Sequence, residues 1–149
     1  MRPLPVAVLL GSLLGAATWL APLPPAQAEL PPWVYGQEQR AAPLRLELEV
    51  LTVQRWPLLQ PSQLLVRAQV LAVIRQPRGG RLRPGDRLQL RYPLPAQHLR
   101  GWVGPAPLPL LSAGERVPAW LAPDPAGSGV YRPAAGGYSF GPEMEAVRE

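Results

Sequence analysis

The stretch Leu44–Val53, which reads LRLELEVLTV, decides the fold class of this 149-residue chain. From residue 44 to residue 50, apolar side chains alternate with charged ones, which is typical of a β-strand with one solvent-exposed face. The alternation slips by one residue after Val50, because Leu51 and Val53 are apolar and Thr52 is polar. A β-bulge produces such a slip and bends the strand. We therefore predict a bent first strand, as a small barrel requires.

Three further segments have strand-like sequences. Residues 64–76 (LLVRAQVLAVIRQ) could also form a helix, but their β-branched side chains and the flanking prolines favour a strand. Its inner face would run in steps of two from Leu64 to Ile74. Residues 87–92 (RLQLRY) follow a Pro-Gly-Asp turn and alternate again. Residues 115–121 (ERVPAWL) contain a proline, which lacks a backbone N–H, so we expect an edge strand or a bulged one.

Two short segments near the C-terminus, 130–131 and 137–140, are predicted to supply a fifth strand. Five short strands separated by uneven loops predict an all-β domain over residues 44–140. The expected architecture is a small, partly open barrel of the oligonucleotide/oligosaccharide-binding (OB) type. A β-sandwich is the alternative.

The segments that flank this domain have no clear periodicity. Residues 29–43 are expected to form an extended leader, because Pro31-Pro32 favours polyproline geometry. Residues 141–149 are expected to be a flexible, charged tail.

The composition excludes several classes of protein. The chain has 22 prolines, 14 glycines and no cysteine. Disulfide-stapled miniproteins, thiol enzymes and most structural zinc sites need cysteine. A helical bundle could not hold so many prolines, since each interior one costs about 3 kcal/mol. With 47% hydrophobic and 17% charged residues, the chain is also too apolar for an ordinary disordered segment.

Residues 1–28 have the sequence of a cleaved signal peptide. Arg2 precedes an apolar run from Val6 to Ala21, and Ala26-Gln27-Ala28 offers small side chains for cleavage before Glu29. The alternative is a membrane anchor, but the run is shorter than the roughly 20 residues that span a bilayer. We therefore expect export to the periplasm or the exterior, with no transmembrane anchor after cleavage. Residues 29–149 would then carry 14 arginines and 10 acidic residues, a net charge of +4.

Residues 64–140 resemble small exported bacterial proteins that are best represented in cyanobacteria. The resemblance rests on the order of the strand-like segments, on Pro84-Gly85-Asp86, on the Gly-Trp-x-Gly-Pro segment at 101–105 and on AAGGYSF at 134–140. These proteins are similar in pattern to the barrel of the netrin and tissue-inhibitor-of-metalloproteinases group. The resemblance implies the barrel, but not the inhibition, which in that group depends on an N-terminal cysteine that chelates zinc.

The sequence offers little for catalysis or metal binding. His98 is the only histidine, and no Gly-x-Ser-x-Gly motif is present. Glu47 and Glu49 share one strand face, but Arg45 flanks them, so we expect a solvated face with cross-strand ion pairs. We predict a protein without enzymatic activity, cofactor or metal. A small hydrolase that uses His98 with a serine is the alternative from another class.

A basic stretch is the strongest polar feature of the sequence. Six arginines fall within 17 residues, with Asp86 as the only acid among them. They are Arg75, Arg78, Arg81, Arg83, Arg87 and Arg91. On a hairpin, three of them, Arg75, Arg87 and Arg91, could share an outer face with Arg67 and attract anions. Alternatively, the arginines only solubilise the hairpin and protect a strand edge.

Trp102, beside Arg100 in a loop rich in glycine and proline, could stack on a ligand or plug the barrel. The candidate ligand-binding residues are Arg75, Arg87, Arg91, Arg100 and Trp102. They predict an exported binding module of the cell envelope, with an envelope protein or an anionic glycan or lipid surface as partner. Export makes nucleic acid an unlikely partner. The alternative is a structural accessory subunit that uses the apolar segment 105–111 (PAPLPLL).

Overall fold

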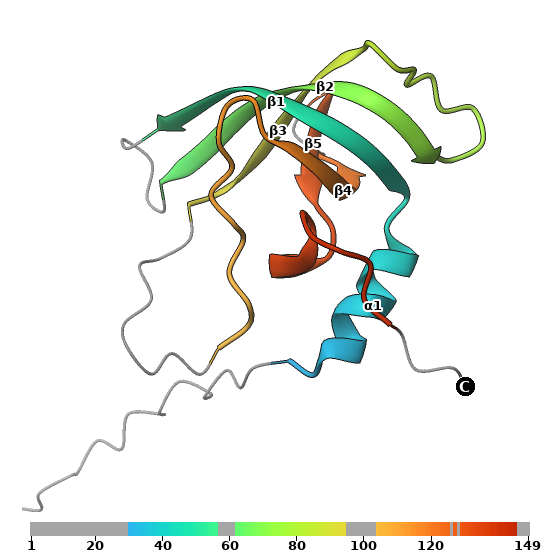
Figure 1. Cartoon of the computed structure of the whole chain (residues 1–149), viewed down its shortest axis with the longest axis vertical. Helices are drawn as coiled ribbons and strands as arrows, with labels where there is room; N and C mark the ends of the chain where they lie inside the picture. Colours follow the sequence, from blue (N-terminus) through green and yellow to red (C-terminus); the bar gives the residue numbers. More distant parts are fainter. Residues whose placement is uncertain (1–29, 57–61, 95–103, 126, 128, 146–149) are drawn as a thin grey trace, which may run out of the picture.

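The computed structural model describes residues 30–56, 62–94, 104–125, 127 and 129–145 (Figure 1). In these residues, five strands form a closed barrel, with one α-helix before it and one 3-10 turn after it. The helices and strands are α1 (Pro32–Ala41), β1 (Leu44–Trp56), β2 (Gln63–Arg75), β3 (Arg87–Pro93), β4 (Arg116–Pro123), β5 (Val130–Pro133) and the 3-10 turn η1 (Gly136–Tyr138).

The strands follow one another around the barrel in the order β1-β2-β3-β5-β4, and β4 pairs with β1 to close it. All pairs are antiparallel except β3 with β5. The prediction of an all-β, five-stranded small barrel is therefore confirmed, and the β-sandwich alternative is wrong. The barrel is closed rather than partly open, because β1 is long enough to pair with β2 along its whole length and with β4 at its start.

The core is the inner face of the barrel. Alternate residues of β1 point inward, from Leu44 to Val50, and so do alternate residues of β2, from Leu64 to Val70. Leu88, Leu90 and Tyr92 of β3 add a third row, and the inner residues of β4 complete the cluster. The alternation in the sequence thus predicted the inner face of each long strand up to its bulges.

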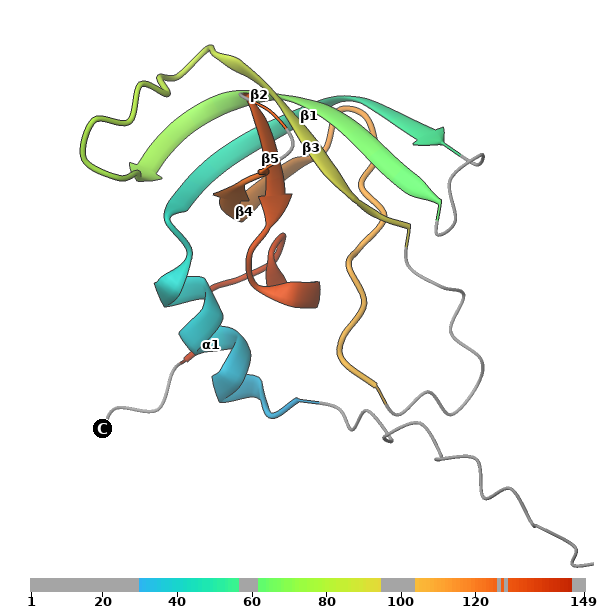
Figure 2. The same cartoon turned by 180° about the vertical axis from the view of Figure 1, so that it is seen from behind.

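Three register shifts bend the β1–β2 ribbon, which Figures 1 and 2 show curving over the barrel. One lies between Val50 and Thr52, so the predicted bulge at Leu51 is confirmed. The other two leave Leu71 and Ile74 of β2 without a partner in β1. The expectation that Ile74 points inward is wrong, because the two bulges shift the alternation and leave its side chain 48% exposed.

The expected extended leader is also wrong, because residues 32–41 form α1. Pro32 stands in the first helical turn, where proline is tolerated since its missing N–H would have no helical partner. Tyr35 and Gln39, one turn apart, face the body of the protein and are buried. In the described part of the chain, no helix is long and apolar enough to span a bilayer.

Residues 137–140 do not form the expected strand. The Ser139 hydroxyl accepts a hydrogen bond from the Ala135 N–H and donates one to the Gly136 carbonyl, each at 2.8 Å. These local bonds, together with the positive φ of Gly136, favour a 3-10 turn over a strand. Ala135, the residue before the turn, belongs to a second small cluster, in which Trp120 packs on the outside of β4 against Ala42 and Ala135.

The segment after η1 is bound to α1. The Gln39 side chain donates to the carbonyls of Tyr138 and Pro142 and accepts from the Met144 N–H, at 2.7–3.0 Å. Arg45 forms a 3.0 Å ion pair with Glu143. The expected flexible tail therefore does not begin at residue 141, since residues 142–144 are held by side chains from α1 and β1.

Candidate anion-binding groove

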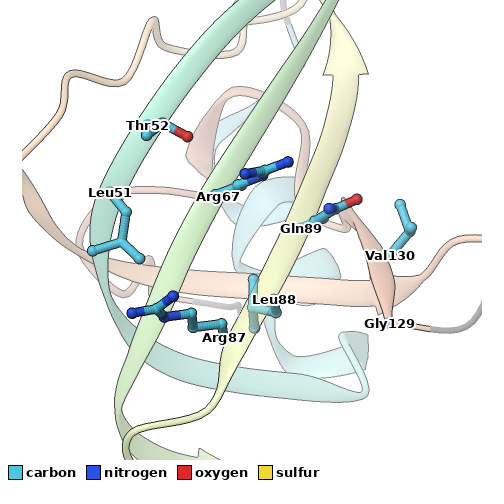
Figure 3. A pocket seen from close by; sticks show the side chains of 8 residues that line it. All are labelled: Leu51, Thr52, Arg67, Arg87, Leu88, Gln89, Gly129 and Val130. Carbon is cyan, nitrogen blue, oxygen red and sulfur yellow. The ribbon is translucent and has the colours of Figure 1, made fainter.

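The register of the sheet places four outward-facing residues in one row across four strands. Thr52 of β1 pairs with Arg67 of β2, Arg67 pairs with Gln89 of β3, and Gln89 pairs with Val130 of β5. Figure 3 shows these side chains following one another across the ribbons. Arg87 lies two residues before Gln89 on β3, on the same outer face. The strands themselves, rather than a loop, therefore position the polar side chains of this surface.

A cavity of about 560 Å³ lies over this row. We call it the groove. Its lining combines two cationic and two neutral polar side chains with apolar ones from three strands. It consists of Leu51, Thr52, Arg67, Arg87, Leu88, Gln89, Gly129 and Val130. Among the described residues of this lining there is no acid, so they give the groove a positive local charge.

The two arginines are available for a ligand. Among the described residues, neither the Arg67 nor the Arg87 side chain has a hydrogen-bond or ion-pair partner, and both residues are exposed. Arg67 lies opposite Gln89, and Arg87 is therefore its diagonal neighbour on β3. Diagonal neighbours on adjacent strands have Cα atoms roughly 7–8 Å apart, within reach of long side chains. The two guanidinium groups can thus contact one anionic group or two adjacent ones.

Two of the protein's carboxylates, Glu49 and Asp124, form ion pairs with arginines outside the groove. The Glu49 carboxylate lies 3.5 Å from Nε of Arg116, which belongs to β4 on the other side of β1 from β2. Asp124 forms a 3.2 Å ion pair with Arg91. These pairings reduce competition for Arg67 and Arg87 from the protein's own carboxylates.

The groove has the chemistry to hold an anion attached to a carbon framework. A guanidinium offers N–H donors in a planar fork that matches carboxylate, sulfate or phosphate oxygens. The Thr52 hydroxyl and the Gln89 amide can donate to or accept from neighbouring hydroxyl groups. Leu51 and Val130 supply apolar contact at the two sides. The groove is therefore suited to a polar ligand with at least one negative group.

Arg75, a predicted ligand-binding residue, has a structural role instead. Its Nη2 donates to the carbonyl oxygens of Gln39 and Ala42, at 2.7 and 2.6 Å, where α1 ends. The last carbonyls of a helix lack partners within the helix and carry partial negative charge. The structure therefore places the predicted residue Arg75 outside the groove, because the helix that packs beside the end of β2 could not be foreseen from the strand pattern.

Arg91, the next predicted residue, lies outside the groove. It is the fourth residue after Arg87 along β3, which corresponds to a distance of about 13 Å at the usual rise of a strand. Its ion pair with Asp124 and the neighbouring Arg132 line a smaller cavity of about 290 Å³. The structure therefore does not bring Arg91 together with Arg87. Arg87 itself lines the groove, on the outer face where it was predicted.

Arg100 and Trp102, the last two predicted ligand-binding residues, lie outside the described residues, and so does His98. Of the apolar segment 105–111, Leu111 is buried and Leu108 packs on the barrel core, whereas Leu110 is exposed. Within the described ranges, no three His, Asp or Glu side chains gather as they would around a metal ion.

Sequence reasoning found the arginines but missed their neighbours. Arg67 and Arg87 were expected on one outer face, because strand alternation fixes their parity. Gln89 has the same parity as Arg87 and Arg91 on β3, so its place on the same outer face could have been predicted from the sequence. Thr52 and Val130 join only through the register of β1 and β5, which no local pattern specifies. Comparisons with protein-family models, with curated proteins and with solved structures found no match for this chain.

Proposed function

We propose that this protein is an exported, non-enzymatic binding module of the cell envelope that holds an anionic ligand in the groove. The observation that carries the proposal is the pair Arg67 and Arg87, both exposed and without a protein partner among the described residues. They line a cavity whose described lining contains no acid. The proposed export rests on the signal-like sequence of residues 1–28.

We further propose that the barrel is of the OB type. The strand order β1-β2-β3-β5-β4 supports this, as does the parallel pairing of β3 with β5. OB barrels bind oligonucleotides and oligosaccharides on the face of strands 2 and 3, between the loops that follow strands 1 and 4. The groove uses that face, with Arg67 from β2, Arg87 from β3, and Gly129 from the connection between β4 and β5.

An acidic polysaccharide fits the proposed groove better than a nucleic acid. Strands that bind nucleic acid usually present aromatic side chains on which the bases stack. The described lining offers Leu51 and Val130 instead of aromatic rings, together with one hydroxyl and one amide group. Export would also bring the protein to uronate-bearing or sulfated glycans rather than to nucleic acid. The proposed ligand is therefore a carboxylated or sulfated sugar chain.

A binding experiment with matched polymers tests this function. The purified protein is titrated with dextran sulfate, with polygalacturonate and with neutral dextran. We expect salt-sensitive binding to at least one of the two acidic polymers and none to neutral dextran. Arg67→Glu/Arg87→Glu should weaken that binding at least tenfold, while Arg40→Glu/Arg132→Glu, with the same change of charge at other exposed sites, should not. Equal losses in the two variants would contradict the assignment of the groove.

A further inference from the structure

The connection between β2 and β3 forms a second cationic surface, separate from the groove. Arg78, Arg81 and Arg83 are all exposed there. Among the described residues, none of the three side chains has a hydrogen-bond or ion-pair partner. Residues 71–85 contain four arginines and no acid, which equals the net charge of +4 over residues 29–149. The connection itself, residues 76–86, holds three of these arginines and Asp86, so its own net charge is +2.

Hydrogen bonds give this connection a defined shape. The Gly80 N–H donates to the Pro77 carbonyl at 2.9 Å, and the Arg83 N–H donates to the Asp86 carboxylate at 2.7 Å. Gly79 and Gly85 have φ of 82° and 94°, a backbone conformation in which a side chain would be strained. The Asp86 carboxylate is thereby occupied with a backbone N–H, and the three arginine side chains extend from an ordered turn.

Exposed apolar side chains lie on the strand that leads into this connection. Leu71 and Ile74 are the two residues that the bulges of β2 displace from the ladder, and they are 37% and 48% exposed. They lie near the end of β2 from which the connection starts. Both views in Figures 1 and 2 show this end of the hairpin projecting beyond the barrel. Apolar and cationic side chains therefore occur together at the projecting end.

We propose that this projecting end, defined by Leu71, Ile74, Arg78, Arg81 and Arg83, docks on the surface of an anionic lipid bilayer. Anionic headgroups attract arginine over a Debye length, and apolar side chains next to the arginines can enter the boundary between headgroups and acyl chains. This end of the hairpin projects beyond the barrel (Figures 1 and 2), which suits contact with an extended bilayer better than with a small ligand. The proposal uses none of the residues of the groove and stands independently of the proposed function.

Vesicle co-sedimentation tests the proposal. The purified protein is mixed with vesicles of phosphatidylglycerol and phosphatidylcholine in equal parts, or with vesicles of phosphatidylcholine alone. We expect binding only to the anionic vesicles, weakened by salt. Arg78→Glu/Arg81→Glu/Arg83→Glu should lower the affinity by about 100-fold or more. Leu71→Ser/Ile74→Ser should lower it several-fold, because these side chains contribute contact but no charge.

Two control variants separate this surface from general charge and from the groove. Arg40→Glu/Arg55→Glu/Arg132→Glu makes the same change of charge at other exposed positions and should lose much less affinity. Arg67→Glu/Arg87→Glu should keep most of the vesicle binding. Equal binding to neutral vesicles, no binding to anionic ones, or equal loss in both triple variants would overturn the proposal. Full affinity of Leu71→Ser/Ile74→Ser would overturn the apolar contact.

Discussion

The Arg75 guanidinium lies 2.6 Å from the backbone carbonyl oxygen of Ala42 and so joins the end of β2 to the end of α1. A second bond, to the Gln39 carbonyl at 2.7 Å, uses the same Nη2. Arg75 also pairs with Arg45 in the ladder, and the Arg45 guanidinium lies over the Trp120 ring at 5.4 Å. Two adjacent arginines thus have structural roles, whereas the exposed arginines of the following turn have no polar side-chain partner among the described residues.

Replacing Arg75 should destabilise the protein without affecting the groove. Arg75→Met removes both bonds to the carbonyls at the end of α1, and hydrogen bonds to charged groups are worth about 1.5–3 kcal/mol. We expect the free energy of unfolding to fall by about 2 kcal/mol in urea titrations. The stability of Arg75→Lys should lie between that of the parent protein and that of Arg75→Met, because an ammonium group can still donate a hydrogen bond. Unchanged stability of Arg75→Met would contradict the structural role.

Gln39 should hold the segment that follows η1. Its amide donates to two carbonyls and accepts from the Met144 N–H, and the residue is buried. Gln39→Ala should lower the free energy of unfolding by about 2–3 kcal/mol, because buried polar groups lose their partners. Hydrogen exchange gives a local readout. The Met144 amide should exchange faster in the variant than in the parent protein, while the amides of β1 to β3 keep their order of protection.

Gly137 should tolerate no side chain. A Cβ at this position would lie 2.6 Å from the Pro107 carbonyl oxygen, which belongs to a different segment of backbone. Gly137→Ala should therefore cost about 1–3 kcal/mol, as overpacking does. Gly141→Ala is the matched control, because its Cβ would meet nothing within 4 Å. Equal melting temperatures for the two variants would show that the backbones at residues 107 and 137 are not in close contact.

Tyr92 should make stability fall in strongly alkaline solution. Burial raises the pKa of Tyr92 to about 12, and the nearby Glu115 carboxylate adds to the rise. The folded state therefore favours the protonated phenol. Its contribution is complete below the unfolded pKa of about 10 and is lost as the pH rises toward 12, by roughly 2–3 kcal/mol. Urea unfolding across this range should show the decline, and Tyr92→Phe should lack that part of it. The same slope in both proteins would contradict the assignment.

Most of the barrel could be predicted from the sequence, because a strand with one buried face shows a local alternation of apolar and polar residues. The slip after Val50 even located a bulge. The two bulges in β2 were not predictable, since Leu71 and Ile74 continue an apolar run in which either parity could face inward. Helix α1 was missed for another reason. It is held by Tyr35 and the polar Gln39 rather than by an apolar stripe, so it has no hydrophobic period to detect.

The candidate site was predictable only in part. Arg87 was placed on the outer face correctly, but Arg75 and Arg91 have partners that lie far away in the sequence, in α1 and at Asp124. The amino-acid sequence alone does not show which guanidinium groups are bound to other groups of the protein and which are exposed to ligands. The row from Thr52 to Val130 likewise depends on strands that meet only in the closed barrel. Pairing over long sequence distances decides which arginines remain available.

The most direct test of the central claim is a map of amide chemical shifts during titration with a short polygalacturonate or sulfated oligosaccharide. The account predicts that the largest changes follow the row across the sheet, at Thr52, Arg67, Arg87, Gln89 and Val130, and that the amides near Arg91 change little. The changes should disappear in Arg67→Glu/Arg87→Glu, whose unliganded spectrum should match that of the folded parent protein, because both side chains lie on the outer face of the barrel. Saturable shifts confined to another surface, or no shifts with either oligosaccharide, would contradict the claim that this groove binds anionic ligands.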